Sequence, residues 1–221
     1  MATITAIEKQ KRRRRAFVYL EDAPPLDLRL DVVAAAGLRP GMALGSVRAS
    51  ELVAEDRRLG ATDAALRLLA ASPRSQKDLR LRLTRRGFPR EAIDAAIARM
   101  RQLGYLDDAA FARFWVETRQ AATPRSKRAL AFELAGRGVA REHVEAAIAG
   151  RSDAEAAYEA ARRRLRALHG LDYRTFQRRL GSFLSARGFG YGVARATVQR
   201  CWEETNGPSG AEAAPAGDED D

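Results

Sequence analysis

The chain has 221 residues, of which 39 are lysine or arginine and 29 are aspartate or glutamate, so its formal net charge is +10. One cysteine and two histidines exclude an intramolecular disulfide and most zinc sites. Neither a transmembrane run of about 18 apolar residues nor the apolar core of a secretory signal is present. We therefore expect a soluble, cytoplasmic and monomeric protein without a cofactor or metal, whose charge favours a polyanionic partner.

The first 45 residues predict a small β-hairpin segment. Residues 4–7 and 16–20 are β-branched or aromatic runs, and the basic stretch between them is typical of a turn. Pro24 and Pro25 are expected to stop the second strand, because proline cannot donate to a ladder. The alternation of Leu26, Leu28 and Leu30 is compatible with a third strand, and residues 31–37 with one or two helical turns.

Residues 46–204 are rich in alanine, leucine, arginine and glutamate, which favour helices. Within them a pattern of two leucines four apart, followed by Arg-Gly, recurs with a period of about 50 residues. It comprises Leu79, Leu83 and Gly87, then Leu130, Leu134 and Gly138, then Leu180, Leu184 and Gly188. Leucines at this spacing share one helix face, and the glycine is typical of a left-handed helix cap.

A second helix is expected after each glycine, and an earlier one before each leucine pair, over residues 62–71, 108–122 and 153–168. Ser75 and Ser126 are predicted N-caps of the central helices. The fold class is therefore mainly α: three tandem three-helix repeats in an elongated curved array, preceded by the β-hairpin segment. We place the repeats at 46–105, 106–150 and 151–204, followed by a disordered acidic tail over 205–221.

The tail holds five acidic residues and no base, so residues 1–204 alone carry +15. Thirty-five of the 39 bases are arginines, which bind phosphate through paired N–H groups. The candidate nucleic-acid or filament contacts lie at the hairpin tip and on the central helices. They are Arg12, Arg13, Arg14, Arg15, Arg74, Lys77, Arg82, Arg86, Arg125, Lys127, Arg128 and Arg178.

Catalytic patterns are absent from the sequence, and we expect no enzymatic activity. There is no phosphate-binding loop of the G-x-x-x-x-G-K type and no G-x-S-x-G elbow. The glycine-rich stretch 188–192 follows a predicted helix, so capping is favoured over nucleotide binding. Asp107 or Asp108 is more simply a helix cap than a metal ligand, and Cys201 is expected in the core.

Several of these motifs together resemble a known family. Pro73-Arg-Ser75, Leu79, Leu83 and Gly87-Phe88, then Gly104-Tyr-Leu-Asp-Asp108 and Phe111-Ala-x-x-Trp-Val116, resemble RecX, the bacterial regulator of the RecA recombinase. The resemblance covers about residues 62–202. It implies tandem three-helix modules, no catalysis, and binding to RecA filaments on single-stranded DNA, usually with restraint of ATP hydrolysis and strand exchange.

Two other hypotheses stay open at this point. Three-helix units with short turns are also the architecture of helix-turn-helix regulators, which read double-stranded DNA without RecA. A plain helical scaffold, whose arginines serve only as a solvated surface, would bind no nucleic acid at about 0.15 M salt.

Overall fold

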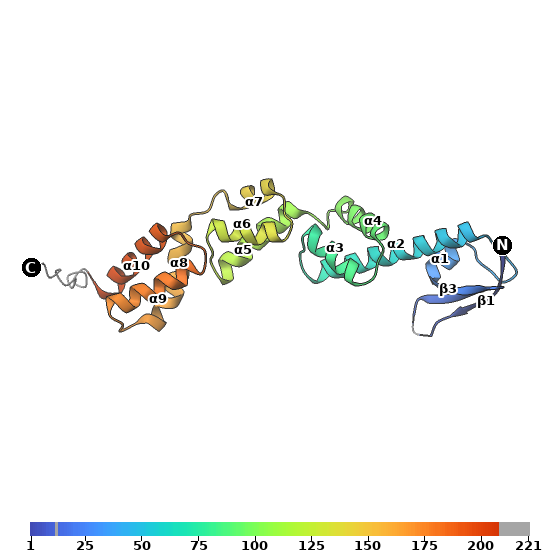
Figure 1. The fold of residues 1–221 in the computed structure, drawn as a ribbon, viewed down its shortest axis with the longest axis horizontal. Helices are drawn as coiled ribbons and strands as arrows, with labels where there is room; N and C mark the ends of the chain where they lie inside the picture. Colours follow the sequence, from blue (N-terminus) through green and yellow to red (C-terminus); the bar gives the residue numbers. More distant parts are fainter. Residues whose placement is uncertain (12, 208–221) are drawn as a thin grey trace, which may run out of the picture. The chain divides into compact units, whose positions relative to one another are not determined.

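A computed structural model describes residues 1–11 and 13–207 (Figure 1). The strands are β1 (Ala2–Lys9), β2 (Arg15–Leu20), β3 (Ala23–Arg29) and β4 (Ala43–Leu44). The helices are α1 (Leu30–Ala35), α2 (Ser46–Ala71), α3 (Gln76–Arg85), α4 (Arg90–Gln102), α5 (Asp108–Ala122), α6 (Lys127–Gly136), α7 (Arg141–Ile148), α8 (Asp153–Leu165), a 3-10 helix (Arg166–Leu168), α9 (Tyr173–Ser185) and α10 (Tyr191–Asn206).

The predicted fold class is confirmed in its elements: a small antiparallel strand segment precedes three three-helix repeats. Repeat 1 comprises α2–α4, repeat 2 comprises α5–α7, and repeat 3 comprises α8–α10. The chain divides into two compact units, residues 1–107 and 108–221. The elongated curved arrangement and the repeat boundaries given above stay predictions.

The N-terminal segment is a four-stranded antiparallel sheet with strand order β3-β2-β1-β4. The predicted hairpin and the third strand are both present, whereas the short β4 was not expected. The expectation that Pro24 and Pro25 end the second strand is wrong, because β2 ends at Leu20 and both prolines lie within β3. Since β3 is an edge strand, it tolerates residues that cannot donate to a neighbour.

Helix α2 is much longer than the predicted 62–71, since it begins at Ser46. Its first half packs against the sheet, where Leu52 joins a core with Ile4, Val18 and Leu28. Its second half supplies Ala61, Ala64, Ala65 and Leu68 to the core of repeat 1. One continuous helix therefore serves two cores in the first unit.

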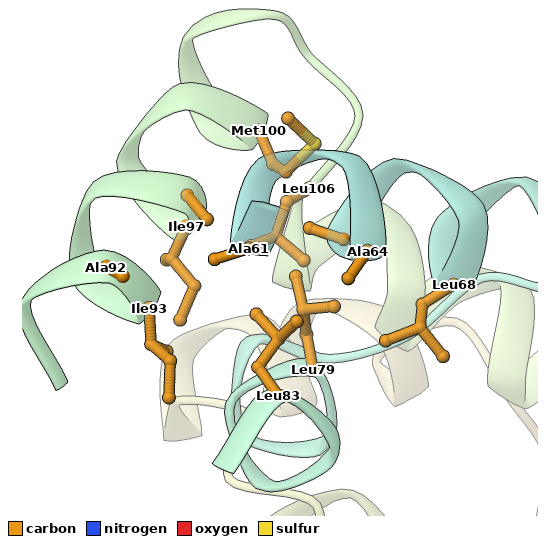
Figure 2. Close-up of a cluster of buried hydrophobic side chains, with 12 residues drawn as sticks. Ala61, Ala64, Leu68, Leu79, Leu83, Ala92, Ile93, Ile97, Met100 and Leu106 are labelled. Atoms are coloured by element: carbon orange, nitrogen blue, oxygen red, sulfur yellow. The ribbon is translucent and has the colours of Figure 1, made fainter. Parts of the chain in front are cut away.

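The core of repeat 1 shows the predicted leucine face directly. Leu79 and Leu83 of α3 point between Ile93 and Ile97 of α4 and the small residues of α2 (Figure 2). The equivalent pairs Leu130–Leu134 and Leu180–Leu184 are also fully buried in the cores of repeats 2 and 3.

The central helices of repeats 1 and 2 begin, and the central helices of all three repeats end, as the sequence predicts. The Oγ atoms of Ser75 and Ser126 accept the N–H groups of Asp78 and Ala129 at 3.2 and 3.1 Å. The glycines that follow α3, α6 and α9 have φ angles of +80°, +77° and +87°. The next residue folds back in each case, and its N–H donates to the carbonyl of the second leucine.

Repeats 2 and 3 meet where the start of α6 approaches the end of α9. The Ser126 N–H donates to the Arg187 carbonyl at 3.2 Å. A Cβ on Gly188 would lie 2.6 Å from the Ser126 Oγ and 2.8 Å from the Ala129 Cβ. Gly188 therefore both ends a helix and lets two repeats touch, whereas a Cβ on Gly87, the equivalent glycine of repeat 1, would meet no atom within 4 Å.

The boundary of the predicted tail needs correction. Thr205 and Asn206 belong to α10, and their side chains donate to the carbonyls of Cys201 and Trp202 at 2.7 and 3.2 Å. These bonds extend the helix by two residues. The acidic residues of the predicted disordered tail lie outside the described residues.

Replacing Gly188 by alanine tests this contact. A left-handed alanine costs about 1 kcal/mol, and the close approach to Ser126 adds about 2 kcal/mol of overpacking. We expect G188A to lower the thermal midpoint of the full chain clearly more than G87A does. G87A has the same backbone requirement without the contact, so equal losses in calorimetry would contradict the role of Gly188 in joining the repeats.

A second prediction concerns Asp56, a buried carboxylate of α2 that accepts the Arg29 N–H at 2.7 Å and an Arg15 N–H at 3.1 Å. Losing charged hydrogen bonds costs about 2 kcal/mol. We expect D56A to speed hydrogen exchange of the β2 and β3 amides by roughly thirtyfold, while E51A, at an exposed site on the same helix, leaves it unchanged. Similar exchange in both variants would show that Asp56 does not hold the sheet on α2.

Candidate nucleic-acid interface

The basic residues at the hairpin tip do not all have the same role. Arg13 and Arg14 are exposed between β1 and β2, as is Lys11. The Arg15 guanidinium instead pairs with Asp27 at 2.9 Å and with Asp56 at 3.1 Å, and so ties the sheet to α2. Arg12 lies outside the described residues. The tip thus presents exposed cations, but Arg15 is engaged within the fold.

In repeat 1, two of the candidate arginines share one carboxylate. Arg74 and Arg82 each donate to the Asp78 Oδ2 at 2.9 Å, and Arg74 also donates to the Leu68 carbonyl at 3.0 Å. Burial raises the pKa of Asp78, but the bonds from Arg74 and Arg82 outweigh burial and hold that pKa below its ordinary value. Arg74 is mostly covered, so the proposed interface does not include it.

The C-terminal end of α3 is an accessible basic site in repeat 1. Arg85 and Arg86 are exposed there, and neither pairs with a carboxylate from residues 1–11 or 13–207. Cations are also favourable at this position because the helix dipole is negative at its C-terminus. Lys77, at the other end of α3, is exposed as well.

Repeat 2 concentrates its charge around Glu133. This carboxylate accepts N–H groups from Trp115 and Arg119, both at 2.9 Å, and lies 3.1 Å from the Arg125 Nε. The guanidinium of Arg137 stacks over the Trp115 ring at 3.7 Å from its centroid. Glu133 is therefore shared between two cations, Arg119 and Arg125.

The other candidates in the second unit differ in exposure. Lys127 is half-buried, and its N–H donates to Asp153 at 2.8 Å across the junction of repeats 2 and 3. Arg128 is exposed on α6. Arg178 lies on the exposed face of α9 with Arg174 and Arg179, opposite the buried Phe176, Leu180 and Leu184. These three arginines form a basic face on α9.

Two groups of arginines were missing from the candidate set. Arg162, Arg163 and Arg166 line an open cleft beside α8, where Arg163 also donates to the Ala121 and Ala122 carbonyls at 2.9 Å. Arg164 and Arg187 both lie over the Phe183 ring. The Arg162–Arg164 run was a visible signal in the sequence, whereas Arg187 reads only as a cation before a capping glycine.

Cys201 and Gly188 have the structural roles that the sequence predicts. Cys201 is fully buried, and burial raises its pKa to about 11, so the thiol stays protonated near neutral pH. Gly188 acts as the predicted helix cap. Across the described part of the chain, no three His, Cys, Asp or Glu side chains are grouped to hold a metal ion. Nor does any helix there combine the length and apolar character needed to cross a membrane.

Three family models match the chain in succession. They are the first three-helix domain of RecX over residues 61–100, the second over 107–148 and the third over 152–198. The regulatory protein RecX of Thermobifida fusca (strain YX) is 39% identical over 168 residues, which span 75% of this chain and 88% of that relative. The regulatory protein RecX of Streptomyces coelicolor is 37% identical over 143 residues, or 63% of this chain and 76% of that relative.

Solved structures show the same architecture. A crystal structure of a regulatory protein RecX matches 90% of this chain and 100% of its own with a TM-score of 0.64 at 21% identity. The crystal structure of RecX from Lactobacillus salivarius matches 66% of this chain and 97% of its own with a TM-score of 0.57 at 20% identity. At these identities the likeness concerns the fold alone.

The exposed cations at the end of α3 allow a specific test. If Arg85 and Arg86 contact phosphates, R85E/R86E should weaken binding to a single-stranded oligonucleotide by roughly tenfold, since a charged hydrogen bond contributes about 1.5–3 kcal/mol. The salt dependence of the affinity should also become less steep. Arg82 is unsuitable for this test because its reversal would place a second carboxylate beside Asp78.

The matched control is R99E/R101E, which makes the same charge change in the last turn of α4. Binding is measured by fluorescence anisotropy at several salt concentrations, with thermal unfolding as the check on folding. Equal losses in the two variants would mean that only total charge matters.

Proposed function

Since the three matched domains and the 39% identity to a relative show that this chain belongs to the RecX family of regulatory proteins, we propose that it binds filaments of the RecA recombinase on single-stranded DNA. Its proposed effect is to restrain the ATP hydrolysis and strand exchange of the filament. The protein would thereby act in homologous recombination, DNA repair and the SOS response, as a monomer in the cytoplasm.

The observation that carries this proposal is the succession of three family domains between residues 61 and 198, in repeats that each expose arginines. A polyanion such as single-stranded DNA attracts cations spread along a chain of repeats, and each contact releases counterions from the strand. Exposed arginines at the end of α3 and on α6 and α9 supply such contacts.

The proposed action is binding and not catalysis. Arginines that contact phosphates position a protein on a nucleic acid without reading its sequence. Such binding is compatible with a regulator that follows a filament whatever DNA it contains. No cofactor or metal is required by this mode of action.

The alternative is a helix-turn-helix regulator of double-stranded DNA, because each repeat consists of three short helices. That alternative predicts sequence-selective binding to a duplex without RecA. The present proposal predicts little dependence on base sequence. Comparing several duplexes and single strands of one length distinguishes the two.

The direct test is the ATPase activity of RecA on single-stranded DNA during titration with this protein. We expect the hydrolysis rate to fall as the protein is added and to level off at saturation. Electron microscopy of the same mixtures should show the protein along the filaments. An unchanged rate at saturating protein, together with undecorated filaments, would overturn the proposal.

A further inference from the structure

Three arginines from different elements converge where repeats 2 and 3 meet. Arg125 precedes the N-cap of α6, Arg164 lies on α8, and Arg187 follows α9. The guanidinium carbons of Arg187 and Arg164 are 3.7 and 5.7 Å from the centroid of the same Phe183 ring. The hydrogen bond from the Ser126 N–H to the Arg187 carbonyl brings Arg125 to the same place.

The three cations are poorly compensated. The side-chain Nε atoms of Arg125 and Arg187 are buried and make no hydrogen bond, although the Arg125 Nε lies 3.1 Å from a Glu133 oxygen. Glu133 is shared with Arg119, and Asp153 is occupied by the Lys127 N–H. Neither Arg164 nor Arg187 pairs with a carboxylate within residues 1–11 and 13–207.

The three cations also repel one another. The pKa of Arg187 lies below its ordinary value because the side chain is partly buried and because Arg125 and Arg164 repel its charge. Arginine stays protonated in proteins, so the repulsion persists in the folded chain. An anion bound among the three side chains would relieve it.

The cluster is also held in place before any ligand arrives. Gly188 packs against Ser126 and Ala129, so the backbone beside Arg187 is fixed relative to the start of α6. Stacking on Phe183 orients the planar Arg187 group. Side chains fixed in this way lose less freedom on binding than free surface arginines do.

Resting on the function proposed above, we infer that Arg125, Arg164 and Arg187 form a binding site for one phosphodiester group of a nucleic-acid strand. The two free oxygens of a phosphodiester accept paired N–H groups from guanidinium forks. A strand is favoured over a single small anion because Arg128 and the basic face of α9 offer further contacts in the same unit.

The test uses the full chain and a twenty-residue oligothymidine without RecA. R164Q and R187Q should each lower the affinity at about 0.1 M salt by roughly tenfold, as expected for the loss of one charge-assisted phosphate contact. Because each removes a repelling charge, the thermal midpoint should be unchanged or higher. R195Q makes the same charge change at an exposed site of α10 and should bind as the parent chain does.

Several outcomes would overturn the inference. One is that R164Q and R187Q bind oligothymidine with the same affinity as R195Q. Another is that the parent chain does not bind oligothymidine. A third is that poly-glutamate binds as tightly as oligothymidine and depends on the same arginines. If inorganic phosphate raises the midpoint of the parent chain but not that of R187Q, while oligothymidine binding is the same in both, the site serves a free anion.

The RecA ATPase assay separates this inference from the proposed function. Arginine-dependent oligothymidine binding without any effect on RecA would support the site and reject the function. The opposite result is also possible: the parent chain restrains the ATPase, but R164Q and R187Q bind oligothymidine with the affinity of R195Q. That result would support the function and reject the site.

Discussion

Each repeat depends on a central helix that ends at a glycine with a positive φ angle. The left-handed residue turns the chain so that Phe88, Val139 or Phe189 folds back against its repeat. The following helix can then cover the two leucines of the central helix. Because each core is small, this turn decides whether the third helix can contribute to it.

The third of these glycines, Gly188, adds a constraint that Gly87 lacks. Its missing Cβ lets repeats 2 and 3 approach at Ser126. The same approach brings Arg125 and Arg187 together, so close packing and concentrated positive charge have one origin. Binding sites are commonly supported by such rigid contacts.

The helices of the repeats could be predicted from the spacing of a few residue types along this one sequence. Leucines four apart, a capping glycine and an N-cap serine are local features, and the structure places all of them as predicted. The start of α2 was not predictable in this way, because Gly60 interrupts the pattern and is accommodated by packing against Phe88. Strand β4 has only two residues and depends on pairing with β1.

The roles of the arginines were harder to predict because ion pairs depend on distant partners. Arg15 is bound by Asp56, which lies 41 residues away in the sequence. Exposure and pairing are properties of the folded chain, so a run of cations in the sequence does not reveal which members stay available. Arg187 carries no sequence signal beyond its place before a glycine.

Helix α2 has a mechanical consequence. With 26 residues it extends about 39 Å, and it is embedded at one end in the sheet and at the other in repeat 1. The basic hairpin and the first repeat are therefore connected by one continuous helix. A partner that binds the hairpin also fixes the orientation of the first repeat, so contacts at these two places are not independent of each other.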